Sequence, residues 1–175
     1  MHEVSVQLLG GFRLCDATGR EIKIPSRKGR ALLAYLATHL NESHSRDRLA
    51  MLLWEDAEED LARTSLRQAL AALRKALPSP ILRADTDSIA LDGAVATDLA
   101  ELRQALASST MADVRRIVDC YRGDLLEGLD ARSAAFEDWL SQERLALRQQ
   151  VTQALQKLTA LCVANEDTDG ALLAC

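Results

Sequence analysis

The residues best suited to bind a charged ligand lie between Leu61 and Ala84, a stretch that contains no Asp or Glu. The cations in this stretch are Arg63, Arg67, Arg74, Lys75 and Arg83. Cations bind phosphates without regard to sequence, whereas forked side chains read base edges, as Arg does at guanine and Gln at adenine. Because an exposed helix normally interleaves Glu with its Arg, the missing acids indicate a surface for nucleic acid.

A helix over about residues 56–77 is predicted to position most of these cations. It begins near Asp56, which with Glu59 resembles a capping box, and it ends before Pro78. The stripe that we expect to be buried consists of Leu66, Leu70, Leu73 and Leu77. The face beyond it presents Arg63, Thr64, Arg67, Gln68, Ala71, Arg74 and Lys75. We expect this face to enter a DNA groove, although the same pattern fits a solvated face whose Arg stems cover the core.

Two further groups of cations stand in the first turns of predicted helices. Ser26 and Ser45 are the predicted N-caps of these helices. The cations that follow the caps are Arg27, Lys28 and Arg30 in one helix and Arg46 and Arg48 in the other. A helix N-terminus carries partial positive charge, so cations there are unfavourable unless an anion such as a phosphate docks beside them. We therefore expect phosphate contacts at Lys28, Arg46 and Arg48, with simple exposure of these side chains as the alternative.

The first 95 residues contain the order of elements that a winged helix-turn-helix needs. Short strands are predicted in VSVQLLG, FRLC and IKI, and they form a small antiparallel sheet at the N-terminus. Three helices follow: one over about residues 27–39, a shorter one capped by Ser45, and the helix over about residues 56–77. The segment ILRADTDSIAL then predicts a hairpin, the wing, on which Arg83 is placed to reach a phosphate or the minor groove.

Residues 96–175 are predicted to be entirely helical, which makes the protein mostly α with a small β part. Helices are expected in DLAELRQALA and MADVRRIVDCY, and a Gly-marked loop, YRGDLLEGLD, precedes a long helix over about residues 134–164. The run EDTDG ends that helix, and GALLAC starts another that the end of the chain interrupts. Such tandem helix pairs indicate an all-α domain like tetratricopeptide repeats, truncated after a partial repeat.

The composition limits the classes of protein to which the chain can belong. Residues 1–95 carry 13 Lys/Arg against 13 Asp/Glu and residues 96–175 carry 8 against 13, so the net charge of −5 comes from the second half. No stretch is long and apolar enough for a membrane span, and the N-terminus lacks the pattern of a secretion signal. We therefore expect a cytoplasmic protein with no membrane partner.

No pattern indicates an enzyme, a metal site or a cofactor. The sequence has no glycine-rich phosphate loop, no GxSxG motif and no paired His and carboxylate at ligand spacing. Its 4 cysteines form no CxxC pair, so we expect reduced, structural thiols. Phe136 and Trp139 lie three residues apart on an apolar helix face, and we predict that both are core residues.

Several sequence blocks resemble the Streptomyces-type antibiotic regulatory protein (SARP) family of bacterial transcription activators. The OmpR-type DNA-binding domain of that family is similar to LLGGFRL, IPSRKGRALLAYLA and RDRLAMLLWEDAEEDLARTSLRQALAALRKAL. Its bacterial transcriptional activation domain is similar to YRGDLLEGL and FEDWLSQERLALRQQ. The resemblance implies a homodimer on direct promoter repeats of double-stranded DNA and contact with RNA polymerase. It also implies base recognition by Arg63, Thr64, Arg67 and Gln68, with Arg74 and Lys75 facing the DNA backbone.

Two other interpretations of the sequence remain open. The helical half could bind a protein partner or a regulatory ligand while the winged domain serves as a docking platform, because a fold does not fix a function. The chain could also be the N-terminal regulatory module of a larger multidomain ATPase or cyclase regulator. The second of these is compatible with DNA binding, whereas the first is not.

Overall fold

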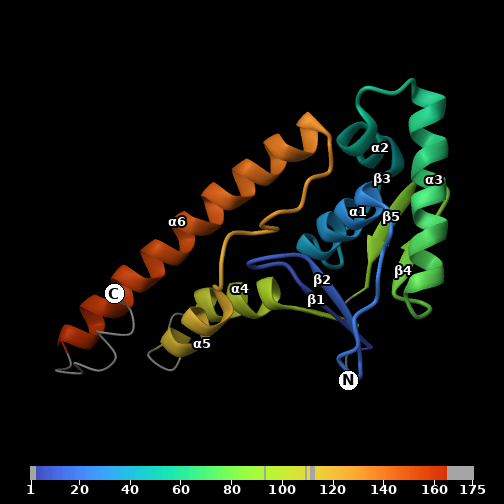
Figure 1. The fold of residues 1–175 in the computed structure, drawn as a ribbon. Helices are drawn as coiled ribbons and strands as arrows, with labels where there is room; N and C mark the ends of the chain where they lie inside the picture. Colours follow the sequence, from blue (N-terminus) through green and yellow to red (C-terminus); the bar gives the residue numbers. More distant parts are fainter. Residues whose placement is uncertain (1–2, 93, 109, 111–112, 165–175) are drawn as a thin grey trace.

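A computed structural model describes residues 3–92, 94–108, 110 and 113–164 of the chain. A winged-helix unit forms the N-terminal half, and a helical unit follows it (Figure 1). The long C-terminal helix runs along one side of the molecule, and the helix predicted to read DNA stands on the opposite side (Figure 1).

The N-terminal sheet has three strands in the order β2-β1-β6. Strand β1 (Val4–Gln7) pairs antiparallel with β2 (Arg13–Asp16) and parallel with β6 (Val95–Thr97). The prediction of IKI as the third strand is wrong, because residues 22–24 form no strand: the isolated bridge with Cys15 comes from Glu21, just before them. The third strand comes instead from residues that follow the hairpin.

The first two helices begin where the sequence predicts. Helix α1 (Arg27–Thr38) starts after Ser26, whose Oγ accepts a hydrogen bond from the Gly29 N–H at 3.1 Å. Helix α2 (Arg46–Trp54) starts after Ser45, whose Oγ accepts from the Arg48 N–H at 3.2 Å. Each serine satisfies one N–H that the first turn of its helix leaves without a partner.

The predicted hairpin is confirmed and belongs to a second sheet with the order β3-β5-β4. Strands β4 (Leu82–Ala84) and β5 (Ser88–Leu91) pair antiparallel. The short strand β3 (His44–Ser45) pairs with β5 immediately before α2. This pairing attaches the wing to the start of the helix-turn-helix.

Helix α3 (Glu59–Ala76) buries the predicted leucine stripe but starts later than expected. The buried residues of the stripe are Leu66, Leu70, Leu73 and Leu77, each at most 7% exposed. The predicted start at Asp56 is wrong because a turn, closed by the Ala57 N–H to the Trp54 carbonyl at 3.0 Å, comes first. Glu58 takes the N-cap position with an extended backbone and makes no side-chain capping bond.

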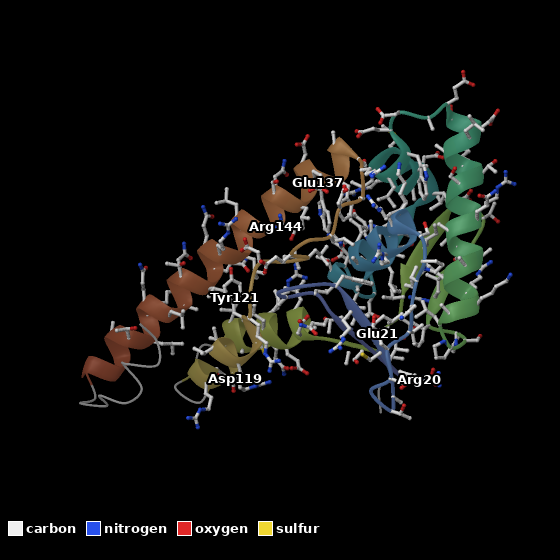
Figure 2. All side chains as sticks on the ribbon, in the orientation of Figure 1. Arg20, Glu21, Asp119, Tyr121, Glu137 and Arg144 are labelled. Atoms are coloured by element: carbon white, nitrogen blue, oxygen red, sulfur yellow. The ribbon has the colours of Figure 1, made fainter. Side chains whose placement is uncertain are left out.

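Three helices and a long connection form the second unit. They are α4 (Asp98–Ser108), α5 (Asp113–Cys120) and α6 (Ala134–Ala164), which confirms the predicted helices in these ranges. Arg144, on α6 in Figure 2, holds the connection by donating to the carbonyls of Leu125 and Leu126 at 2.7 and 3.0 Å. The helix expected in GALLAC lies outside the described residues.

The two units meet where α6 begins beside the end of α2. Ser133 donates through its hydroxyl to the Leu52 carbonyl at 2.7 Å, and the Glu55 carboxylate accepts from the N–H groups of Ala134 and Ala135. A carboxylate at this position caps α6, and its negative charge interacts favourably with the positive end of the helix dipole. Phe136 is fully buried and Trp139 is half-buried, and the Trp139 ring lies 4.8 Å from that of Tyr35, which confirms the predicted packing role of both residues.

A buried carboxylate at the start of α5 predicts a specific acid dependence of stability. Hydrogen bonds from the Ser108 and Thr110 hydroxyls lower the pKa of Asp113 from 3.8 to about 2. Because the folded-state pKa is depressed, this contribution to stability is complete above 3.8 and is lost as the pH falls through about 2. We expect Asp113→Asn to be less stable than the unaltered chain at pH 5, with the difference shrinking toward pH 2. Urea unfolding of both proteins across this range tests it, and a constant difference would contradict the assignment.

Candidate nucleic-acid interface

A hollow of about 620 Å³ lies between the start of α2, the first half of α3 and the turn of the wing. The residues that line it are Ser45, Arg46, Asp47, Asp60, Arg63, Thr64, Leu66, Arg67, Thr86 and Asp87. We refer to it below as the α2–α3–wing hollow. Four of the predicted DNA contacts therefore meet in one place: Arg46, Arg63, Thr64 and Arg67.

The outward face of α3 carries side chains that are exposed and prepared for hydrogen bonding. Arg67 donates through one Nη to the Thr64 Oγ at 2.9 Å, and this bond orients the guanidinium. Its other N–H groups, like the side chains of Gln68 and Lys75, have no protein partner within the described residues. Arg67, Gln68, Ala71 and Lys75 are all exposed, so this face can approach a groove without first breaking protein contacts.

Arg63 differs from Arg67 because two carboxylates already hold it. Its Nη2 lies 2.6 Å from Glu59 on the preceding turn and 3.2 Å from Asp47 on α2. Its Nε also donates to Asp47 at 3.2 Å. The hydrogen bond and the charge of Asp47 raise the pKa of the Arg63 guanidinium, so it remains a full cation.

The arginines nearest the wing are engaged with the wing itself. Arg46 donates to the Asp85 carbonyl at 2.9 Å, and Arg74 donates to the Ala84 carbonyl at 3.0 Å. The predicted wing residue, Arg83, is exposed and lies 3.7 Å from the Asp92 carboxylate. These contacts fix the position of the wing relative to α2 and α3.

The remaining two predicted phosphate contacts have aromatic neighbours. The Nζ of Lys28 lies 5.5 Å from the ring centre of Trp54, within the range of a cation–π interaction. Arg48 lies beside the hydroxyl of Tyr35, and burial raises the pKa of that hydroxyl while Arg48 lowers it. Burial also lowers the pKa of His44, whose ring is 5.0 Å from that of Tyr35. Neither Lys28 nor Arg48 is among the residues that line the α2–α3–wing hollow.

The sequence prediction did not include the acids of this surface. Asp47, Asp60 and Asp87 line the hollow together with the three arginines. They come from α2, from the first turn of α3 and from the turn of the wing, all outside the acid-free stretch. Only the fold brings Asp47 and Asp87 to this surface, whereas Asp60 precedes Arg63 by three residues on the same helix and is visible in the sequence.

Three further observations concern metal ligands, cysteine thiols and membrane-spanning helices. Across the described residues, no group of three or more His, Cys, Asp or Glu side chains is arranged to hold a metal ion. Cys15 and Cys120, the cysteines whose side chains the structure describes, are free thiols. None of the helices in the described ranges is long and apolar enough to cross a membrane.

Comparison with known proteins finds similarity at the level of structure. No family model and no curated protein matches the chain. Among solved structures, the chain is similar to EmbR of Mycobacterium tuberculosis, which was solved in complex with a low affinity phosphopeptide. The TM-score is 0.66 at 19% identity, over 98% of this chain and 53% of the EmbR chain. The chain thus spans about half of EmbR and shares the fold of that part.

Proposed function

We propose that this chain is a sequence-specific transcription regulator that reads the major groove of double-stranded DNA with α3. The observation that carries the proposal is the outward face of α3, where Arg67, Gln68 and Lys75 are exposed beside the wing. Helix α6 stands on the other side of the molecule and does not cover this face (Figure 1). The face is therefore available to a duplex without movement of the helical unit.

The side chains of the proposed interface divide by the chemistry that each can perform. Thr64, Arg67 and Gln68 have the donors and acceptors that read base edges, and Ala71 is small enough to let the helix approach. Phosphate contacts are assigned to Lys28, Arg46, Arg48, Arg74, Lys75 and Arg83. Arg63 belongs to the reading face once its carboxylate partners are displaced.

The activating role is the finer part of the proposal. It rests on the resemblance to the SARP family and on the fold shared with EmbR, a SARP-family regulator. By this analogy, the tetratricopeptide-like helical unit recruits RNA polymerase, and two copies bind direct repeats in a promoter. Glu55 and Ser133 join this unit to α2, so a polymerase contact on the helical unit would be held at a fixed position relative to the bound DNA.

DNA binding by the full chain is expected to depend steeply on salt. Each neutralised phosphate releases counterions, so the six assigned phosphate contacts would weaken binding about 1000-fold between ~50 and ~200 mM KCl. Fluorescence anisotropy with a 30-base-pair duplex selected from a random library by the chain itself measures this slope. Failure to select or bind any duplex at the lowest salt would contradict the proposed function.

The alternative is a regulatory or protein-docking module of a longer protein, including a larger ATPase or cyclase regulator. It is favoured by one observation, that the chain spans only about half of the EmbR chain. EmbR itself was solved with a phosphopeptide. Absence of duplex binding by a correctly folded chain would favour the protein-docking module, whereas a regulatory module of a larger ATPase or cyclase regulator is compatible with DNA binding.

A further inference from the structure

The α2–α3–wing hollow is electrically balanced, although the acid-free stretch predicts a positive surface. Its arginines are Arg46, Arg63 and Arg67, and its acids are Asp47, Asp60 and Asp87. Glu59 adds a further carboxylate beside Arg63. A phosphate that approaches this part of the surface therefore meets three guanidinium groups and, with Glu59, four carboxylates.

Arg63 shows how this balance acts on a single reading residue. Its contacts with Asp47 and Glu59 are all at 3.2 Å or less, yet its own side chain is 46% exposed and theirs are 67% and 75% exposed. Exposed ion pairs of this kind are weak, so an incoming ligand can displace them. A ligand that does so must offer Arg63 better acceptors while lying close to two carboxylates that have lost their partner.

From this geometry we propose that Asp47 and Glu59 are specificity-determining residues, which restrain Arg63 so that only a matching base releases it. The inference rests on the proposed function. A guanine offers Arg two acceptors in a fixed geometry, which can replace both carboxylate contacts. A backbone phosphate brings its own negative charge next to Asp47 and Glu59, and the repulsion makes its contact unfavourable. Binding to wrong sequences is weakened more than binding to the right one, which is discrimination through a repulsive element.

The test measures the full chain and its variants Asp47→Asn, Glu59→Gln and the double variant on two duplexes. One is the duplex selected by the unaltered chain, and the other has the same composition in scrambled order. Asn and Gln keep the shape of each side chain and remove only its charge. We expect the double variant to bind the scrambled duplex about tenfold more tightly, with a salt slope steeper by about one. Its affinity for the selected duplex should rise less than about threefold, so the ratio of the affinities for the selected and the scrambled duplex becomes smaller.

Two controls separate the restraint on Arg63 from a general charge effect. Asp119→Asn makes the same charge change on α5, well away from α3 (Figure 2), and should leave both affinities unchanged. Adding Arg63→Gln to the double variant should abolish the gain on the scrambled duplex. Thermal melting of every variant confirms that the fold is intact, and Glu59→Gln alone still tests the idea if Asp47→Asn weakens the start of α2.

Each outcome decides one of the two claims. A double variant that binds like the Asp119→Asn control, or one that keeps its gain after Arg63→Gln, overturns the restraint while leaving DNA binding in place. Equal tightening on both duplexes overturns it as well. If neither the unaltered chain nor any variant binds a duplex, the proposed function fails and this inference fails with it.

Discussion

Replacement of Arg67 by Ala is expected to weaken binding to the selected duplex by about tenfold to 100-fold. Arg67 is exposed on α3, and the Thr64 hydroxyl holds one arm of its guanidinium at 2.9 Å. This preorganisation reduces the rotamer entropy that Arg67 would lose on contacting a base. Alanine removes the whole forked contact to the base. The affinity for the scrambled duplex should fall only about twofold to fivefold, which is the effect of one missing cation.

Anisotropy titrations of both duplexes at one salt concentration measure this difference. The matched control is Arg115→Ala, which removes one exposed cation from α5 and should leave both affinities close to those of the unaltered chain. Gln68→Ala should again weaken mainly the selected duplex, because a bidentate contact to adenine would be lost. If Arg67→Ala weakens the affinity for both duplexes equally, Arg67 contacts a phosphate and not a base, and the proposed reading face loses its central residue.

The helices were predictable from the sequence because their signals are local. Leucines at helical spacing place the buried side of α3, and Ser26 and Ser45 mark the starts of α1 and α2. The start of α3 was misjudged for a local reason as well. Asp56 and Glu59 have the spacing of a capping box, but the turn after Trp54 delays the helix to Glu59.

Features that depend on distant pairing could not be predicted in the same way. Strand β6 joins the N-terminal sheet by parallel pairing of Val95 with Val4, and nothing local distinguishes it from the edge strand expected in IKI. The acids beside Arg63 and Arg67 were missed for the same reason. The sequence shows that residues 61–84 contain no acid. It does not show that the fold places Asp47 and Asp87, from other segments, beside the arginines of that stretch. The domain boundary at residue 95, which falls at the start of β6, stays a prediction.

A second contact between the two units, close to this boundary, is made by Asp98. Its carboxylate accepts from the N–H groups of Leu8 at 2.8 Å and Leu9 at 3.0 Å, across about 90 residues of chain. Leu8 and Leu9 are fully buried, so no solvent can replace this acceptor. The same carboxylate accepts from the Leu99 N–H in the first turn of α4. This side chain therefore ties the end of β1 to the helical unit, beside the backbone hydrogen bonds that join Leu8 to Leu126 and Gly10 to Asp124.

Replacement of Asp98 by Ala should consequently reduce the free energy of unfolding by about 2 to 4 kcal/mol, because two buried N–H groups lose their acceptor. We expect a loss in the lower part of that range. Burial raises the pKa of Asp98 because it disfavours the charged carboxylate, and this cost offsets part of what the hydrogen bonds, which lower the pKa, contribute to stability. Urea unfolding measures the loss, and Glu101→Ala is the matched control, an exposed acid on the same helix with no backbone N–H to satisfy. If Asp98→Ala is no less stable than Glu101→Ala, the apolar contacts and the backbone hydrogen bonds of Leu8 and Gly10 hold the sheet to the helical unit without this carboxylate.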